Sequence, residues 1–180
     1  MPTVDVVRTY LEMRSPDELR PSAALDDPGV VVERLTPCPV GAYRALYDAV
    51  GRAYHWRDRL AWSDEQLGAY LARPTVDVWV LRVGGETAGY FELARHDDGS
   101  VEIAYFGLVG RFIGRGLGGF LLTRAVEEAW RLRPSRVWLH TCTLDAPSAL
   151  PNYRRRGFRE VRTETYRTEL DTPPASPGGQ

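Results

Sequence analysis

The sequence predicts an α/β (α+β) fold in which a mixed, largely antiparallel central sheet is flanked by helices. Two observations predict it. Three consecutive segments alternate apolar and polar residues and are joined by tight turns, which is typical of antiparallel strands. After residue 109 the order changes to glycine-rich loop, helix and strand, which is typical of α/β proteins. The 180 residues fit one domain.

The first half of the chain is expected to hold an N-terminal arm and then one strand and two helices. The arm, residues 1–29, is predicted to be strand-like over Val4–Arg8 and irregular beyond it, where prolines and a glycine interrupt the chain. Apolar residues at helical spacing indicate the helices, and Pro74 stops the second one. The elements expected here are a strand over Val30–Leu35, a helix over Val40–Ala53, and a helix that Ser63 caps and that runs through Leu71.

Three strands joined by tight turns are expected next. Gly84-Gly85 is a strong hairpin signal between the first two strands, and Asp97-Asp98-Gly99 marks the turn before the third. Strands connected so closely form an antiparallel meander. The expected strands span Val76–Val83, Thr87–Arg95 and Ser100–Val109.

The rest of the domain is expected to alternate helices and strands. A glycine-rich loop precedes a helix with periodic apolar residues, and Pro134 separates this helix from the next strand. The domain is predicted over residues 30–170, and the proline- and glycine-rich residues 171–180 are expected to be a disordered tail. The remaining elements are a strand over Arg136–Cys142, a helix from Pro147 to Arg156 and a strand over Arg162–Leu170.

Composition excludes several classes of protein. The formal net charge is −1, without the basic excess that marks nucleic-acid-binding proteins, so no nucleic-acid partner is expected. All 23 basic residues are arginines. A Walker A loop, a protein-kinase lysine and a lysine Schiff base all require lysine, so these three kinds of site are absent.

The sequence also bears on location. No apolar run approaches the roughly 20 residues that a membrane span needs, so no membrane association is expected. No cationic-then-apolar leader follows Met1. The two cysteines, Cys38 and Cys142, are too few for a disulfide framework. We therefore expect a cytoplasmic protein.

The glycine-rich loop indicates a phosphate site. Four of the six residues from Gly114 to Gly119 are glycines, and Arg111 and Arg115 lie beside them. Glycines let the backbone approach a ligand closely, and the free N–H groups at the start of a helix attract anions. The alternative is a flexible loop that only turns the chain. We favour phosphate binding because the glycines are so dense and lie next to two arginines.

Two kinds of phosphate loop fit these residues. Gly114-x-Gly116-x-x-Gly119 matches the dinucleotide fingerprint G-x-G-x-x-G. That fingerprint also requires an acidic residue about 20 positions later, at the end of the next strand. Here that region is Leu139-His140-Thr141. A nicotinamide-dependent oxidoreductase is therefore the weaker interpretation.

The loop resembles the acetyl-CoA motif of the GNAT superfamily of N-acyltransferases. The family pattern is [RQ]-x-x-G-x-[GA] between a strand and a helix, and Arg111-x-x-Gly114-x-Gly116 satisfies it. One feature departs from the family. An alignment anchored on the start of the helix places Ile113 at the Arg/Gln position.

A second motif supports this resemblance. Family members usually continue with a strand and then a helix that ends in Y-x-x-x-G-F, which residues 153–158 match. Ala149 has the residue type that the family often places there, whereas Ala146 stands where the family has asparagine. The resemblance covers residues 76–170, and residues 30–71 fit the family's opening β-α-α.

The resemblance implies a GNAT-like fold with acetyl-CoA as co-substrate. In the family the loop holds the pyrophosphate, and the pantetheine arm lies like an added strand against the strand before the loop. Gly107, inside that predicted strand, fits a bulge or a close backbone approach. The cofactor-binding residues implied by the resemblance are Phe106, Gly107, Leu108, Gly114, Arg115, Gly116, Leu117, Gly118 and Gly119.

The resemblance also implies direct transfer of an acetyl group to an amine. Tyr153 is the candidate acid that protonates the leaving thiolate, and a packed tyrosine is the alternative. Glu102 is the candidate base, with an ordered water or a merely solvated carboxylate as alternatives. Strand alternation is expected to place Glu102, Ala104 and Phe106 on one face.

The other polar residues are less specific. His140 and Cys142 share a face of one predicted strand; we interpret them as packing or pocket residues rather than a nucleophile pair, and expect no metal site. The segment 54–59 lies between the two early helices, a region that often forms a wall of the acceptor pocket in the family.

The expected partner is an amine acceptor, either a small molecule or a protein, and the sequence does not identify which. It is also compatible with a homodimer. The rival function is a catalytically silent acyl-CoA-binding sensor or partner domain on the same fold.

Overall fold

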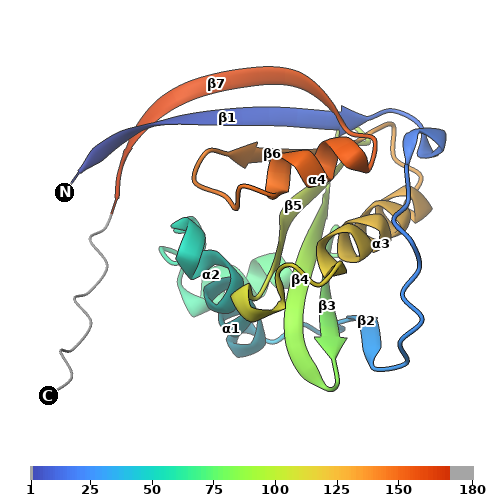
Figure 1. Ribbon diagram of the computed structural model, residues 1–180. Helices are drawn as coiled ribbons and strands as arrows, with labels where there is room; N and C mark the ends of the chain where they lie inside the picture. Colours follow the sequence, from blue (N-terminus) through green and yellow to red (C-terminus); the bar gives the residue numbers. More distant parts are fainter. Residues whose placement is uncertain (1, 171–180) are drawn as a thin grey trace, which may run out of the picture.

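The computed structural model describes residues 2–170 and shows one seven-stranded sheet with helices on both faces (Figure 1). The strand order is β2-β3-β4-β5-β6-β1-β7. Neighbouring strands are antiparallel except β5 and β6, which are parallel. This is the mixed, largely antiparallel sheet that the sequence predicts.

The strands are β1 (Thr3–Met13), β2 (Val30–Arg34), β3 (Val76–Val83), β4 (Glu86–Arg95), β5 (Val101–Leu108), β6 (Val137–Cys142) and β7 (Arg159–Glu169). The helices are α1 (Val40–Gly51), α2 (Asp64–Leu71), α3 (Leu117–Arg131) and α4 (Ala149–Arg155), with short 3-10 turns at Pro16–Glu18, Arg52–Tyr54 and Gly110–Phe112.

The sheet separates two hydrophobic clusters. On one face α3 packs its apolar side, including Leu121 and Ala125, against Leu93 and Ile103 of the sheet. On the other face α1 and α2 pack against β3 and β4, and Tyr43 of α1 is fully buried there. Because each face has its own cluster, the central strands β3 to β5 are fixed from both sides.

The first strand is longer than the sequence predicts and lies inside the sheet. β1 pairs with β6 over Arg8–Met13 and with β7 over Thr3–Glu12, and Leu11 and Met13 are fully buried. Figure 1 shows β1 and β7 running together past the end of β6. The first part of the expected arm is therefore a strand of the sheet. The sequence underestimates its length because the strands that pair with it come from the far end of the chain. The expected tail, residues 171–180, lies outside the described residues.

Most of the other predicted elements are confirmed within a few residues. The strand over Val76–Val83 has the predicted bounds. The cap at Ser63 is a full capping box, in which the Ser63 hydroxyl accepts from the Gln66 N–H and the Gln66 side chain accepts from the Ser63 N–H. β7 begins three residues earlier than expected, at Arg159. These small differences lie at element ends, where local signals are weakest.

The expected face assignment in β5 is wrong because the strand contains a bulge. Glu92 pairs with Tyr105 and Leu93 with Ile103, so Ala104 is an extra residue. As a result Ile103 and Phe106 both pack against the α3 cluster, while Tyr105 packs against the α1–α2 cluster. Glu102 and Phe106 therefore point to opposite faces of the sheet.

Candidate active site

A cleft opens where β5 and β6 separate. The two strands pair at Val101–Val137 and Glu102–Trp138, and make no further pair within residues 2–170. Beyond these pairs β5 bonds to β4 and β6 bonds to β1, so one edge of β5 turns unpaired backbone groups toward the gap. A cavity of about 820 Å³ lies there. Its walls come from β5, β6, the glycine-rich loop, α4 and the α1–α2 connection.

The end of β5 presents its backbone to this cavity. The Gly107 carbonyl faces β4, because a Cβ added at Gly89 would lie 2.5 Å from its oxygen. Backbone groups alternate in direction along a strand, so those of Phe106 and Leu108 face the cleft. All three residues line the cavity. These three residues of β5 are among those that the family resemblance assigns to the cofactor.

The glycine-rich loop opens the start of α3 to the same cavity. Gly114 and Gly116 have φ angles of +82° and +77°, which favour glycine. Gly116 is also the N-cap of α3 and provides no side-chain cap. The first N–H groups of the helix are therefore left without a capping side chain, at the positive end of the helix dipole. Gly114, Gly116, Gly118 and Gly119 line the cavity.

Two of the predicted cofactor-binding residues turn their side chains elsewhere. Arg115 lies over the Phe112 ring, 5.3 Å from its centroid, and Leu117 is 4% exposed in the core. Both line a separate cavity of about 240 Å³. Leu117 is the first residue of α3 and Arg115 precedes its N-cap, but the side chain of Arg115 does not line the large cavity.

Tyr153 on α4 lies in the cavity wall, next to Asn152, whose side-chain amide donates to the Gly118 carbonyl at 3.1 Å. Tyr153 is 6% exposed, and its ring packs edge-on against Phe106 and Phe158 at centroid distances of 6.1 and 6.2 Å. Burial raises the pKa of Tyr153, and the nearby Asp145 carboxylate raises it further. At neutral pH Tyr153 therefore keeps its proton, which is the state that a general acid needs.

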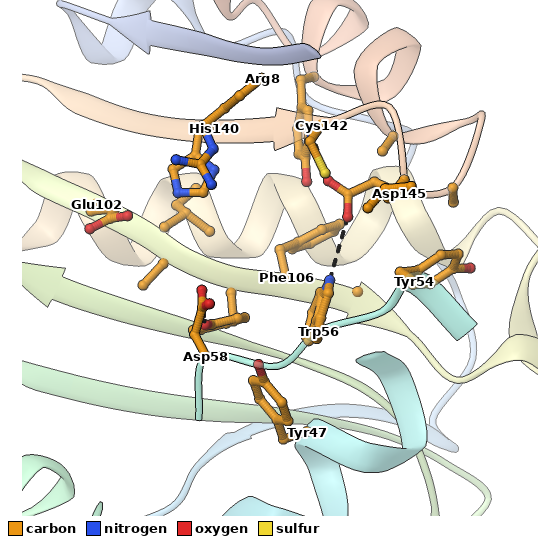
Figure 2. Close-up of a pocket in the computed structure, with 18 of the residues that line it drawn as sticks. Arg8, Tyr47, Tyr54, Trp56, Asp58, Glu102, Phe106, His140, Cys142 and Asp145 are labelled. Carbon is orange, nitrogen blue, oxygen red and sulfur yellow. Dashed lines mark hydrogen bonds between the residues drawn. The ribbon is translucent and has the colours of Figure 1, made fainter. Parts of the chain in front are cut away.

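Glu102 enters the cavity from the other face of the sheet. Its side chain is 15% exposed, and its Oε1 lies 3.0 Å from His96 Nε2. His96 in turn packs against the Trp138 ring at 5.5 Å. His140 and Asp58, which come from different elements, line the same cavity as Glu102 (Figure 2). The sequence analysis did not identify His96 as a partner of Glu102, because His96 lies next to the predicted turn and carries no signal of its own.

The β6 side of the cleft carries Arg8, His140, Cys142 and Asp145 (Figure 2). Asp145 is held rigidly, since its Oδ2 accepts from Thr141 Oγ1 at 2.6 Å and from the Cys142 N–H at 3.0 Å. Burial raises the pKa of Cys142, and the Asp145 charge raises it further. Cys142 is therefore a thiol at neutral pH, which agrees with its interpretation as a pocket residue.

The α1–α2 connection forms the opposite wall. Trp56, Asp58 and Tyr47 point into the cleft (Figure 2). The Trp56 indole N–H donates to Asp145 Oδ1 at 3.4 Å, so the two walls are joined across the opening. Sequence reasoning placed this segment near an acceptor pocket only through the family resemblance. It did not identify Trp56 and Asp145 as a pair, since 89 residues separate them.

A buried ion pair anchors this connection to the sheet. The Arg59 guanidinium donates to Glu92 Oε2 at 2.9 Å, and Glu92 is fully buried. Tyr43 and Tyr70 each donate to the same carboxylate at 2.6 Å. The Trp62 ring lies 4.1 Å from Arg59 Cζ, within cation–π range. Three donors, from α1, α2 and the segment between them, therefore converge on one buried carboxylate of β4 and tie this wall to the sheet.

The structure bears on three other sequence expectations. No group of three His, Cys, Asp or Glu side chains suited to a metal ion occurs within residues 2–170. In the same part of the chain, no helix has the length and apolar character to cross a membrane. Cys38 and Cys142 are both free thiols.

Comparison with known proteins agrees with this architecture. The family model described as acetyltransferase (GNAT) family matches residues 15–158. The chain therefore belongs to the GNAT acetyltransferase family. No curated protein matches the chain.

Several solved structures share the fold. A GCN5-related N-acetyltransferase from Kribbella flavida is 19% identical, with a TM-score of 0.64 over 92% of this chain and 58% of that one. An aminoglycoside acetyltransferase from an uncultured soil metagenomic sample is 16% identical, with a TM-score of 0.60 over 71% of this chain and 87% of the other. An IAA acetyltransferase from Bacillus cereus is 25% identical, with a TM-score of 0.52 over 72% and 77% of the two chains. The chain spans 52% to 63% of the length of the first five similar structures.

Proposed function

We propose that this chain is an N-acetyltransferase that moves an acetyl group from acetyl-CoA to an amine by direct transfer. One observation carries the proposal: a single cleft joins the uncapped start of α3, the free backbone edge of β5 and two side chains suited to proton transfer. Family membership supports acyl transfer in general.

The residues of the cleft fit a long, flexible donor with a diphosphate. Glycines at the start of α3 leave room and free N–H groups for the diphosphate. The unpaired edge of β5 can bond an extended chain as an added strand. Phe106 and Leu108 are the residues whose backbone groups would hold the thioester, and bound acetyl-CoA would supply that thioester.

Two side chains are assigned to proton transfer. Glu102, directly or through a water, takes a proton from the acceptor ammonium so that the amine becomes a nucleophile. Tyr153 gives its proton to the departing thiolate. The two lie on opposite faces of the sheet, so the acceptor would approach from the α1–α2 side while the donor's sulfur faces α4. In this arrangement the acceptor and the acetyl donor enter the same cleft from opposite faces of the sheet.

The test is turnover with acetyl-CoA. We expect thiol release that depends on an added amine, and we would identify the acceptor by mass spectrometry of products formed in a metabolite extract. Binding of acetyl-CoA by calorimetry without transfer to any amine would instead support the silent acyl-CoA-binding sensor. A purified chain that ignores acetyl-CoA at millimolar concentration contradicts both.

A further inference from the structure

The Trp56 indole lies in a slot that depends on Gly51 and that ends beside Gly107. A Cβ added at Gly51 would lie 2.4 Å from Trp56 Cε3, closer than real Cβ atoms approach. A Cβ added at Gly107 would lie 2.4 Å from Val50 Cγ1 and 3.8 Å from Trp56 Cη2. The indole therefore rests beside the backbone of Gly107, the residue at the centre of the β5 segment that faces the cleft.

Neighbouring groups fix the ring in this slot. Tyr47 and Tyr105 lie 5.5 and 5.0 Å from Trp56, measured between ring centroids. The indole N–H donates to Asp145, which its own bonds to Thr141 and Cys142 hold in place. A ring with contacts on several sides cannot move aside without loss of packing.

The indole limits the space at the end of β5. Figure 2 shows the Trp56–Asp145 hydrogen bond joining the two walls of the cleft, whose lining also includes Phe106. Phe106 itself packs against Tyr153 on the other face of the sheet. A group held beside Gly107 is thus bounded by an indole on one side and by two aromatic rings on the other.

We propose that Trp56 is a specificity-determining residue that restricts the acyl donor to the acetyl group. The inference rests on the proposed function, in which the thioester meets β5 at residues 106–108. A longer acyl chain would have to displace the indole from its slot or occupy the passage needed by the acceptor. In a close-packed pocket such displacement is unfavourable.

The test measures binding and needs no acceptor. We would titrate CoA, acetyl-CoA and butanoyl-CoA into the wild-type chain and into Trp56→Ala by calorimetry. In the wild type we expect butanoyl-CoA to bind at least about tenfold more weakly than acetyl-CoA, the lower bound for misplaced methylenes in a fitted pocket. In Trp56→Ala we expect this preference to disappear or reverse, while the Kd of CoA itself is unchanged.

Two further variants act as controls. Trp56→Phe keeps a ring in the slot and removes the indole N–H, so it should retain most of the preference for acetyl-CoA. Trp56→Leu should give an intermediate result and serves if the alanine variant does not fold, as judged by thermal unfolding. A wild type that binds butanoyl-CoA as well as acetyl-CoA, or variants with an unchanged preference, overturns the inference. Absence of CoA binding by the wild type would instead contradict the proposed function.

Discussion

Burial decides the protonation state of single residues along the cleft. It raises the pKa of Tyr153 and of Cys142, and the Asp145 charge adds to both effects. Desolvation lowers the pKa of His140, and the Arg8 guanidinium lowers it further. At neutral pH the cleft therefore presents a protonated hydroxyl, a protonated thiol and a neutral imidazole, so proton donors and acceptors coexist in it.

The hydroxyl of Tyr153 can be tested directly. In Tyr153→Phe we expect kcat to fall by about 100-fold, the usual contribution of a positioned acid, while the Kd of acetyl-CoA stays close to that of the wild type. The ring contacts with Phe106 and Phe158 are kept, so folding should be preserved. Initial rates and calorimetry measure the two quantities. An unchanged kcat would show that Tyr153 only packs.

Cys142 tests the direct-transfer route. Because its raised pKa keeps it a thiol, we expect Cys142→Ala to retain kcat within about threefold, since a covalent route would need an activated thiolate. Intact-mass measurement after incubation with acetyl-CoA should show no acetyl adduct on the wild type. Cys38→Ala, at the other cysteine, controls for the loss of a thiol. An acetyl group on Cys142 would favour a two-step mechanism instead.

Among the elements, the turn from α4 to β7 has the strictest requirement for a glycine. Gly157 has a φ of +106°, and a Cβ there would lie 2.0 Å from the Glu18 carbonyl oxygen. The segment after β1 crosses this turn, and the Arg20 N–H donates to the Arg156 carbonyl at 2.9 Å. The glycine of the Y-x-x-x-G-F motif is therefore needed for backbone packing rather than for contact with a ligand.

A matched pair of glycine substitutions tests this requirement. We expect Gly157→Ala to lower the free energy of unfolding by about 3 kcal/mol, through the strained φ and the clash. Gly41→Ala in α1 meets nothing within 4 Å and should raise that free energy by up to about 0.5 kcal/mol. Urea unfolding measures both. Similar effects of the two substitutions on the free energy of unfolding would mean that the turn can shift to accept a side chain at residue 157, and would contradict the requirement for glycine.

Local signals explain which elements the sequence could predict. The meander, the cap at Ser63 and the glycine-rich loop are each specified by residues close together in the chain. The bulge at Ala104 depends on pairing with β4, and the Trp56–Asp145 bond joins two distant loops. The sequence does not distinguish Glu92 from an exposed polar residue of a strand, because its burial depends on an ion pair with Arg59, which belongs to another segment. The residues that shape the cleft were therefore predicted less well than the elements that carry them.

At the level of the whole molecule, β1 connects the two ends of the chain. It lies between β6 and β7, two strands that are consecutive in sequence apart from α4. It therefore holds together the half of the sheet that forms the β6 side of the cleft. Stability of this half should depend on the buried side chains of β1.

Two substitutions in β1 test this dependence. Leu11 is fully buried, so Leu11→Ala should lower the free energy of unfolding by about 3 kcal/mol. Val7 is 37% exposed, so Val7→Ala should cost less than about 1 kcal/mol. Hydrogen exchange should show the largest loss of protection in β6 and β7 for the Leu11 variant. Equal costs for both substitutions would mean that β1 is only loosely attached.

The position of β1 also has a consequence during translation. β1 leaves the ribosome before the other strands of the sheet, whereas both of its neighbours are the last two to be made. Until they emerge, the backbone N–H and C=O groups of β1 have no strand to pair with. The growing chain therefore carries β1 as an unpaired strand, open to association with other chains, until β6 and β7 have been made.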